Sequence, residues 1–287
     1  MMKKFKKSSG EILSNQEKVT RRLIAGIIIL YTFITILVLV ITFMNSFKTN
    51  SELIGNLFGF PSYPTLQNYD TIFIQSDFLR YFRNSVILSV GGTLGSTLLA
   101  AMTAYGISRY KFKGKGFFSA YFLVGMMIPV QVSVLPLFVM LRRFGLLNRL
   151  EGLILVYIAG ISLSTFVLQK FFRTLPQALE ESARIDGAGE FRIFWSIMLP
   201  LAKPVLSTVA LISIIGQWND FFMPMVLLNT AETRTLTLAI SRYLADFTRN
   251  MSVAFAAVTI TLIPVIILYF VFNKQIVEGI TGGAVKG

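Results

Sequence analysis

The stretch Leu175-Pro-Gln-Ala-Leu-Glu-Glu-Ser-Ala-Arg-Ile-Asp-Gly-Ala-Gly189, followed a short way on by Ile197-Met-Leu-Pro200, is a polar segment between two long apolar runs. Thr174 can cap a helix, and Pro176 suits a first helical turn because its missing N–H costs nothing there. These residues predict a helix over 178–185. Gly187 and Gly189 are expected to end it, since glycine accepts the left-handed conformation of helix ends.

A second short helix is expected after the glycines, with one apolar stripe made by Phe191, Phe194, Trp195 and Met198 at helical spacing. Pro200 and Pro204 are expected to end this helix. The two helices would form a compact hairpin with an aromatic edge, suited to docking. The alternative is a helix lying in the lipid interface. That alternative is disfavoured because the acidic residues of the segment outnumber its arginines, whereas surface binders have a basic polar face.

The rest of the chain is strongly apolar. It has 287 residues, of which 54% are hydrophobic and 14% charged, with a mean hydropathy of +0.67. A helix needs about 20 apolar residues to cross a bilayer. Six such runs predict an all-α integral membrane protein, with spans near 23–43, 84–108, 117–141, 152–169, 204–226 and 251–273. The fifth is the weakest because Asp220 interrupts it.

The basic residues set the expected orientation. Residues 1–22 form a basic tail, the first apolar run is too long for a cleavable signal, and residues 274–287 form a second tail. Lys and Arg favour the cytoplasmic side, so both tails and the loop 173–203 are expected there, with a six-span membrane domain, 23–273, between the tails. Three residues go against this rule on the outer side, Arg142, Arg143 and Arg149, and an extracytoplasmic partner is one explanation. The net charge of +13 then implies no nucleic acid.

The composition also excludes several chemistries. With no Cys and no His, the chain cannot build thiolate or imidazole metal sites or a histidine-dependent nucleophile. It has no G-x-x-x-x-G-K-[ST] loop, so it is not expected to bind ATP. We therefore expect no cofactor, no metal and no enzymatic activity in this chain.

A few polar side chains are expected at depth in the membrane. Gln217, Asn219 and Asp220 cluster near the outer end of the fifth run, and Gln131 lies in the third. Such residues are costly in lipid and usually face a cavity or a partner, so these four are candidates for a substrate path. For Asp220 a position at the membrane interface is an equal alternative. A secondary transporter would need intramembrane ionisable groups, and only Asp220 qualifies; a passive channel stays open until ATP dependence is tested.

The hairpin segment resembles the EAA loop of ABC importer permeases, with Ser182 in place of one alanine. Other segments in order are similar to carbohydrate-type permeases, above all the six-span, maltose-importer-like second membrane subunits. They are Pro64–Tyr69, Asn84-Ser85, Ile128–Gln131 with Pro136, Gly145–Asn148, Gln217–Asp220 and Gly282–Gly287. The resemblance covers nearly the whole chain.

The resemblance implies a type I ABC importer permease in a bacterial plasma membrane, carrying a sugar or oligosaccharide, with glycerol-phosphate or another polyol as the alternative. It implies four kinds of partner besides lipid: a second homologous permease, two cytoplasmic ATP-binding subunits, an extracytoplasmic solute-binding protein and the sugar. The hairpin would be the coupling element for the ATPases, with the tip expected at Glu181, Ala183, Asp186 and Gly187. Its remaining coupling residues would be Phe191, Ile197, Leu199 and Pro200.

Overall fold

The computed structural model describes residues 15–75, 77–245 and 247–284, all of whose regular structure is helical. Three helices are each long and apolar enough to cross a membrane: α1 (Asn15–Asn45), α4 (Phe78–Arg109) and α15 (Phe247–Ala284). Three bent helix pairs raise the possible number of crossings to six. The predicted all-helical, six-span class is therefore confirmed. α15 continues as a helix beyond residue 273, where the last span was expected to end.

Two bent pairs correct the third and fourth predicted spans, and an early helix end corrects the fifth. α5 (Lys115–Gly125) and the unit of η1 (Val130–Ser133) and α6 (Val134–Arg143) meet at 99°. Pro129 begins η1 at that bend, so the third run is not one straight helix. α7 (Leu150–Ala159) and α8 (Ser162–Thr174) meet at a mild 41°. In the fifth run, α12 (Lys203–Trp218) ends before the predicted residue 226. The rest of that run lies in a separate short helix, α13 (Phe222–Leu227).

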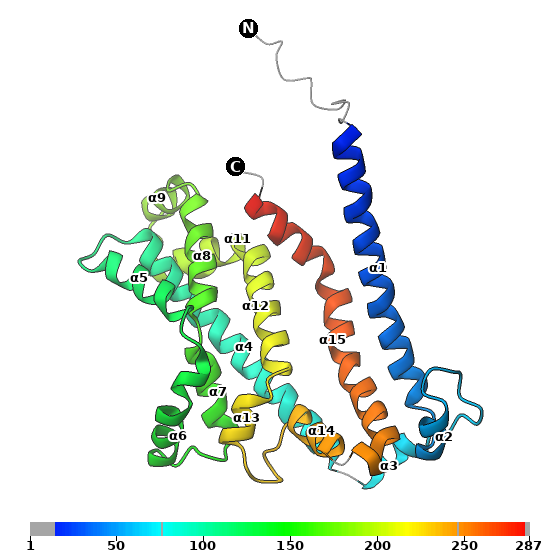
Figure 1. Cartoon of the computed structure of the whole chain (residues 1–287). Helices are drawn as coiled ribbons and strands as arrows, with labels where there is room; N and C mark the ends of the chain where they lie inside the picture. The colour runs from blue at the N-terminus through cyan, green and yellow to red at the C-terminus, as the bar shows by residue number, and fades with distance from the viewer. Residues whose placement is uncertain (1–14, 76, 246, 285–287) are drawn as a thin grey trace.

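The remaining helices are short and lie between the long ones. They are α2 (Asn50–Gly55), α3 (Gln67–Gln75), α14 (Leu236–Ala245) and the hairpin helices α9 (Ala178–Ile185), α10 (Glu190–Ile193), η2 (Phe194–Met198) and α11 (Leu199–Leu201). Figure 1 shows α2, α3, α6, α13 and α14 at one end of the long helices. The start of α1, the end of α15 and α9 lie at the opposite end (Figure 1).

α4 is the central helix of the bundle. Small residues let helices approach closely in lipid, and Ala100, Ala101 and Ala104 of α4 are completely buried. They share one cluster with Leu168 and Phe172 of α8 and with the hairpin. The opposite half of α4 packs against α12, α14 and α15 in a second cluster. In contrast, no residue in the apolar window of α1 is buried inside this chain.

Candidate functional site

The first arm of the hairpin is α9, which ends as the sequence predicts. Gly187 has φ +79°, and its N–H donates to the Arg184 carbonyl while the Ala188 N–H donates to the Ala183 carbonyl. This pair of bonds is a Schellman motif, which satisfies the last carbonyls of a helix. The start of α9 differs from expectation. Thr174 is the last residue of α8 and its hydroxyl donates to the Phe171 carbonyl, so it does not cap α9.

The second arm does not form one simple stripe. Phe194–Met198 is a π-helix, which changes the spacing of the side chains around the axis. Phe194 and Met198 are buried in the core, whereas Phe191 is 71% exposed and Trp195 is half-exposed. The two prolines that were expected to end this helix lie inside helices instead. Pro200 lies within α11 and Pro204 in the first turn of α12, and the chain turns by 77° between these helices.

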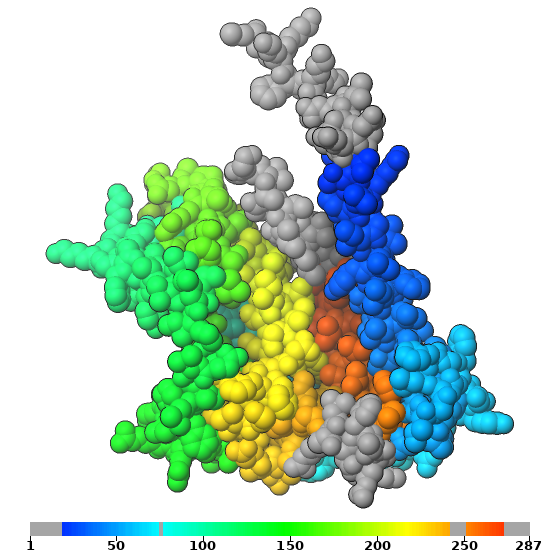
Figure 2. All heavy atoms as spheres, in the orientation of Figure 1, coloured from blue at the N-terminus to red at the C-terminus, as the bar shows by residue number. Residues whose placement is uncertain are grey.

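The hairpin offers an exposed outer surface and a buried inner one. Glu181, Asp186, Gly187 and Pro200 are exposed, and Ile185 beside them is 87% exposed. Ala183 is buried against α4 and α8, which corrects its expected place at the tip, and Ile197 and Leu199 are partly buried against the same core. Ile185 lies between Arg184 and Asp186, so this outer surface combines an exposed apolar side chain with charged ones. Figure 2 shows this region projecting beyond the bundle.

Charge pairing fixes the two arms to each other. Arg184 of α9 donates to both carboxylate oxygens of Glu190, at 2.7 and 3.2 Å, and the Tyr110 hydroxyl donates to the same carboxylate at 2.6 Å. The Arg184 bond, followed by that of Tyr110, lowers the pKa of Glu190 below its usual range. Burial, followed by its bond to Glu190, raises the pKa of the Tyr110 hydroxyl. Glu190 is therefore ionised at neutral pH and bridges the two arms of the hairpin.

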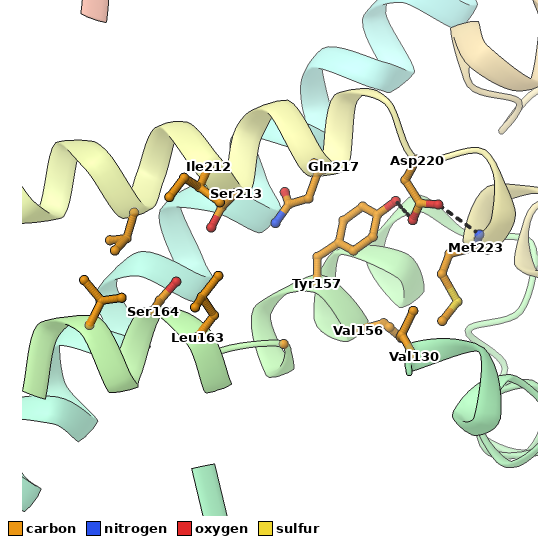
Figure 3. Close-up of a pocket in the computed structure, with 14 residues that line it drawn as sticks. Val130, Val156, Tyr157, Leu163, Ser164, Ile212, Ser213, Gln217, Asp220 and Met223 are labelled. Atoms are coloured by element: carbon orange, nitrogen blue, oxygen red, sulfur yellow. Dashed lines mark hydrogen bonds between the residues drawn. The ribbon is translucent and has the colours of Figure 1, made fainter. Parts of the chain in front are cut away.

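A groove of about 340 Å³ lies between α7, α8 and α12. This volume is at the small end of the range for ligand sites, roughly 300–1,000 Å³. Its wall is mainly apolar, with five polar side chains: Tyr157, Ser164, Ser213, Gln217 and Asp220. Figure 3 shows Gln217 and Ser213 on α12 pointing towards the side from which Tyr157 and Ser164 project. A few polar groups on an apolar wall are typical of a site for a small polar molecule.

Asp220 is held where the chain breaks between α12 and α13. Its carboxylate accepts bonds from the Tyr157 hydroxyl at 2.9 Å and from the Met223 N–H at 3.2 Å (Figure 3). Its carbonyl accepts a bond from the Thr237 hydroxyl at 2.9 Å. Gln217 lies one turn earlier and accepts a bond from the Thr93 hydroxyl of α4 at 3.3 Å. The structure thus brings Gln217 and Asp220 together on the wall of the groove.

The other two predicted path residues lie elsewhere. Asn219 is exposed and donates to the Ile215 carbonyl of its own helix, and Gln131 is exposed on η1. Neither lines the groove. Sequence reasoning also missed Tyr157, Ser164 and Ser213, because single hydroxyls in apolar helices carry no distinctive pattern. The Gly160-Ile161 break between α7 and α8 was the available signal for a cavity there.

The described part of the chain is thus an all-helical bundle with a hairpin at one end and a groove among its helices. Residues 96–282 match the sequence family described as "Binding-protein-dependent transport system inner membrane component". The chain belongs to this family of importer permeases. Its membrane location and its dependence on a binding protein follow from that membership, and the expected class is confirmed.

Curated relatives agree over most of their length. The chain is 35% identical to the diacetylchitobiose uptake system permease protein NgcG of Streptomyces coelicolor, covering 91% of this chain and 87% of the relative. It is 36% identical to a probable starch degradation products transport system permease protein, AmyC, of Thermoanaerobacterium thermosulfurigenes, covering 86% and 90%. A crystal structure of a bacterial ABC transporter that imports alginate contains a chain of the same fold. Its TM-score is 0.80 at 24% identity, covering 92% of this chain and 99% of that one.

Proposed function

We propose that this chain is one of two related permease subunits of an ATP-driven importer for an oligosaccharide or sugar. The observation that carries the proposal is the exposed α9–α11 hairpin in a chain that belongs to the binding-protein-dependent family. Matched relatives include permease proteins named for diacetylchitobiose uptake and for the transport of starch degradation products and arabinooligosaccharides, which supports a sugar. Glycerol-phosphate or another polyol is the alternative substrate.

In this proposal each end of the bundle has its own task. The hairpin end, with the start of α1 and the end of α15, would face the cytoplasm and bind one of two ATPase subunits. The opposite end carries Arg142, Arg143 and Arg149, all exposed, and would receive the loaded solute-binding protein. The unburied α1 and the open groove leave room for a second permease subunit, which would complete the path.

The groove supports a polar, uncharged substrate. Tyr157 offers a ring face and a hydroxyl, while Ser164, Ser213 and Gln217 offer hydrogen bonds that suit sugar hydroxyls. Asp220 is the carboxylate on this wall, and it would repel a phosphate group. This favours a sugar over a glycerol-phosphate.

The test is uptake into proteoliposomes that contain this chain, its partner permease and the ATPase pair. With ATP inside and the loaded binding protein outside, labelled oligosaccharide should accumulate. It should not accumulate without ATP or without the binding protein. Uptake that persists without ATP but follows an ion gradient would contradict the proposal, and competition by glycerol-phosphate alone would reassign the substrate.

A further inference from the structure

Arg109, the last residue of α4, is buried beneath the hairpin with only 5% of its side chain exposed. Its Nη2 donates to the Leu175 carbonyl at 2.8 Å, and its Nε lies 3.5 Å from the Glu180 carboxylate, which is also 5% exposed. One guanidinium therefore joins the end of α4, the residue after α8 and the first turn of α9. These contacts fix the start of the hairpin against the end of α4.

The next residue holds its second arm. Tyr110 donates to Glu190 at the start of α10, as described above, and Glu190 is paired with Arg184. We call Arg109 and Tyr110, with their partners Glu180 and Glu190, the clasp. Two adjacent residues at the C-terminal end of α4 therefore bond to both arms of the hairpin.

Stability does not explain the buried half of the clasp. A buried ion pair is often no more stabilising than apolar side chains of the same volume, since both charges lose their hydration. This pair is also incompletely satisfied. Within the part of the chain that the structure describes, Arg109 Nε and Glu180 Oε1 are buried without a hydrogen bond. Such an incompletely hydrogen-bonded ion pair fixes the position of α9 against the end of α4, at a cost in packing.

The same helix contacts the groove. Gly92 of α4 lies so close to α7 and α12 that an added Cβ would be 2.8 Å from Tyr157 Cβ and 2.5 Å from Gln217 Oε1. Thr93 donates to Gln217, as above. Since an α-helix rises about 1.5 Å per residue, the clasp and this contact are roughly 25 Å apart on one continuous rod.

We propose that Arg109 and Tyr110 are positioning residues that convert movement of the hairpin into movement of α4 and of the groove wall at Gly92 and Thr93. The inference rests on the proposed function, because it requires an ATPase that displaces the hairpin. A rigid helix fixed at both sites can carry such a displacement without bending. The clasp would therefore be needed for coupling rather than for docking.

The experiment uses the reconstituted complex with the double variant Arg109→Gln/Glu180→Gln, which removes both buried charges and leaves neither unpaired. Tyr110→Phe tests the second arm, and Lys111→Gln, an exposed neighbour, is the matched control. We expect the clasp variants to assemble with the ATPases and to keep basal ATP hydrolysis. Stimulation of that hydrolysis by the loaded binding protein should fall by about fivefold or more, the lower range of allosteric coupling, while Lys111→Gln stays at wild type.

Two results would overturn the proposal. Full stimulation in the double variant would show that the clasp is unnecessary for coupling. Loss of assembled complex in proportion to lost uptake would show that the contact is only structural. Failure of the proposed function is distinguishable, because the wild-type complex itself would then show no ATP-dependent uptake.

Discussion

Gly187 is the residue whose conformation most clearly sets the shape of the hairpin. Its φ of +79° costs an L-residue roughly 1–2 kcal/mol, while an ideal Cβ there meets nothing within 4 Å in this chain. The left-handed conformation expected for Gly187 is confirmed, and close approach of a partner surface at this residue is a prediction.

Substitutions at Gly187 separate these two effects. Asn tolerates the left-handed conformation better than Ala does, but it is larger. If only the backbone matters, Gly187→Asn should retain more ATPase co-purification than Gly187→Ala; if a partner surface approaches, the order should reverse. In either case we expect Gly187→Asp to reduce docking while the helices still insert. Full complex assembly and normal uptake in Gly187→Asp would remove the residue from the docking surface.

The groove allows a similar test with a built-in control. Tyr157→Phe removes the hydroxyl that binds the Asp220 carboxylate, and a hydrogen bond to a charged group is worth about 1.5–3 kcal/mol. We expect the maximal uptake rate to fall by about tenfold or more, with the half-saturating concentration unchanged because the binding protein sets it. Asn219→Ala should have no effect, since that side chain bonds its own helix. An equal loss in both variants would indicate a general packing defect instead of a substrate path.

Among the helices, α9 carries the clearest surface for a partner. Glu181 is exposed in its first turn, near the positive end of the helix. Glu181→Lys should weaken ATPase binding several-fold at low salt, with Glu181→Gln intermediate, because exposed interfacial charges act at long range. The difference between the variants should shrink at high salt. Affinities that are equal at every ionic strength would exclude a charged contact at this residue.

The helices also show which features could be predicted from sequence. The six runs and the start of the hairpin turn follow from apolar length and from Gly187. The 99° bend at Pro129 was not predicted as a break, because proline in a membrane helix can kink it slightly or end a segment, depending on neighbouring contacts. The π-helix at Phe194–Met198 depends on packing against α4 and α8, so local spacing alone predicted the wrong stripe.

The direction in which side chains point was the other feature that the sequence did not predict. Gln217 and Asn219 are two residues apart near the same helix end, yet one lines the groove and the other is exposed. Residues two apart in a helix point about 200° apart, so only one of the two could line the groove. Which one does so depends on the segments that pack around the end of α12, where Asp220 bonds Tyr157 and Met223. Those contacts join segments far apart in sequence, which a single sequence does not reveal.

If the hairpin end is cytoplasmic, Arg142, Arg143 and Arg149 at the far end lie on the outer side, where the positive-inside rule disfavours them. If they receive an acidic face of the binding protein, Arg142→Glu/Arg143→Glu should raise the concentration of binding protein needed for half-maximal ATPase stimulation, most strongly at low salt. Basal ATP hydrolysis should not change. An unchanged titration curve would assign these arginines to another role, such as contact with lipid head groups.

The central claim is that the hairpin binds an ATPase on the cytoplasmic side, and the absence of native cysteine makes one measurement direct. Ile185 ends α9 and Phe144 follows α6, and these two helices lie at opposite ends of the bundle (Figure 1). The two residues are 87% and 70% exposed. In cells that express the complex, Ile185→Cys should cross-link to an ATPase subunit carrying a surface cysteine and should resist an impermeant thiol reagent. Phe144→Cys should react with that reagent and form no such cross-link. The reverse pattern, or free labelling of Ile185→Cys from outside, would contradict the account.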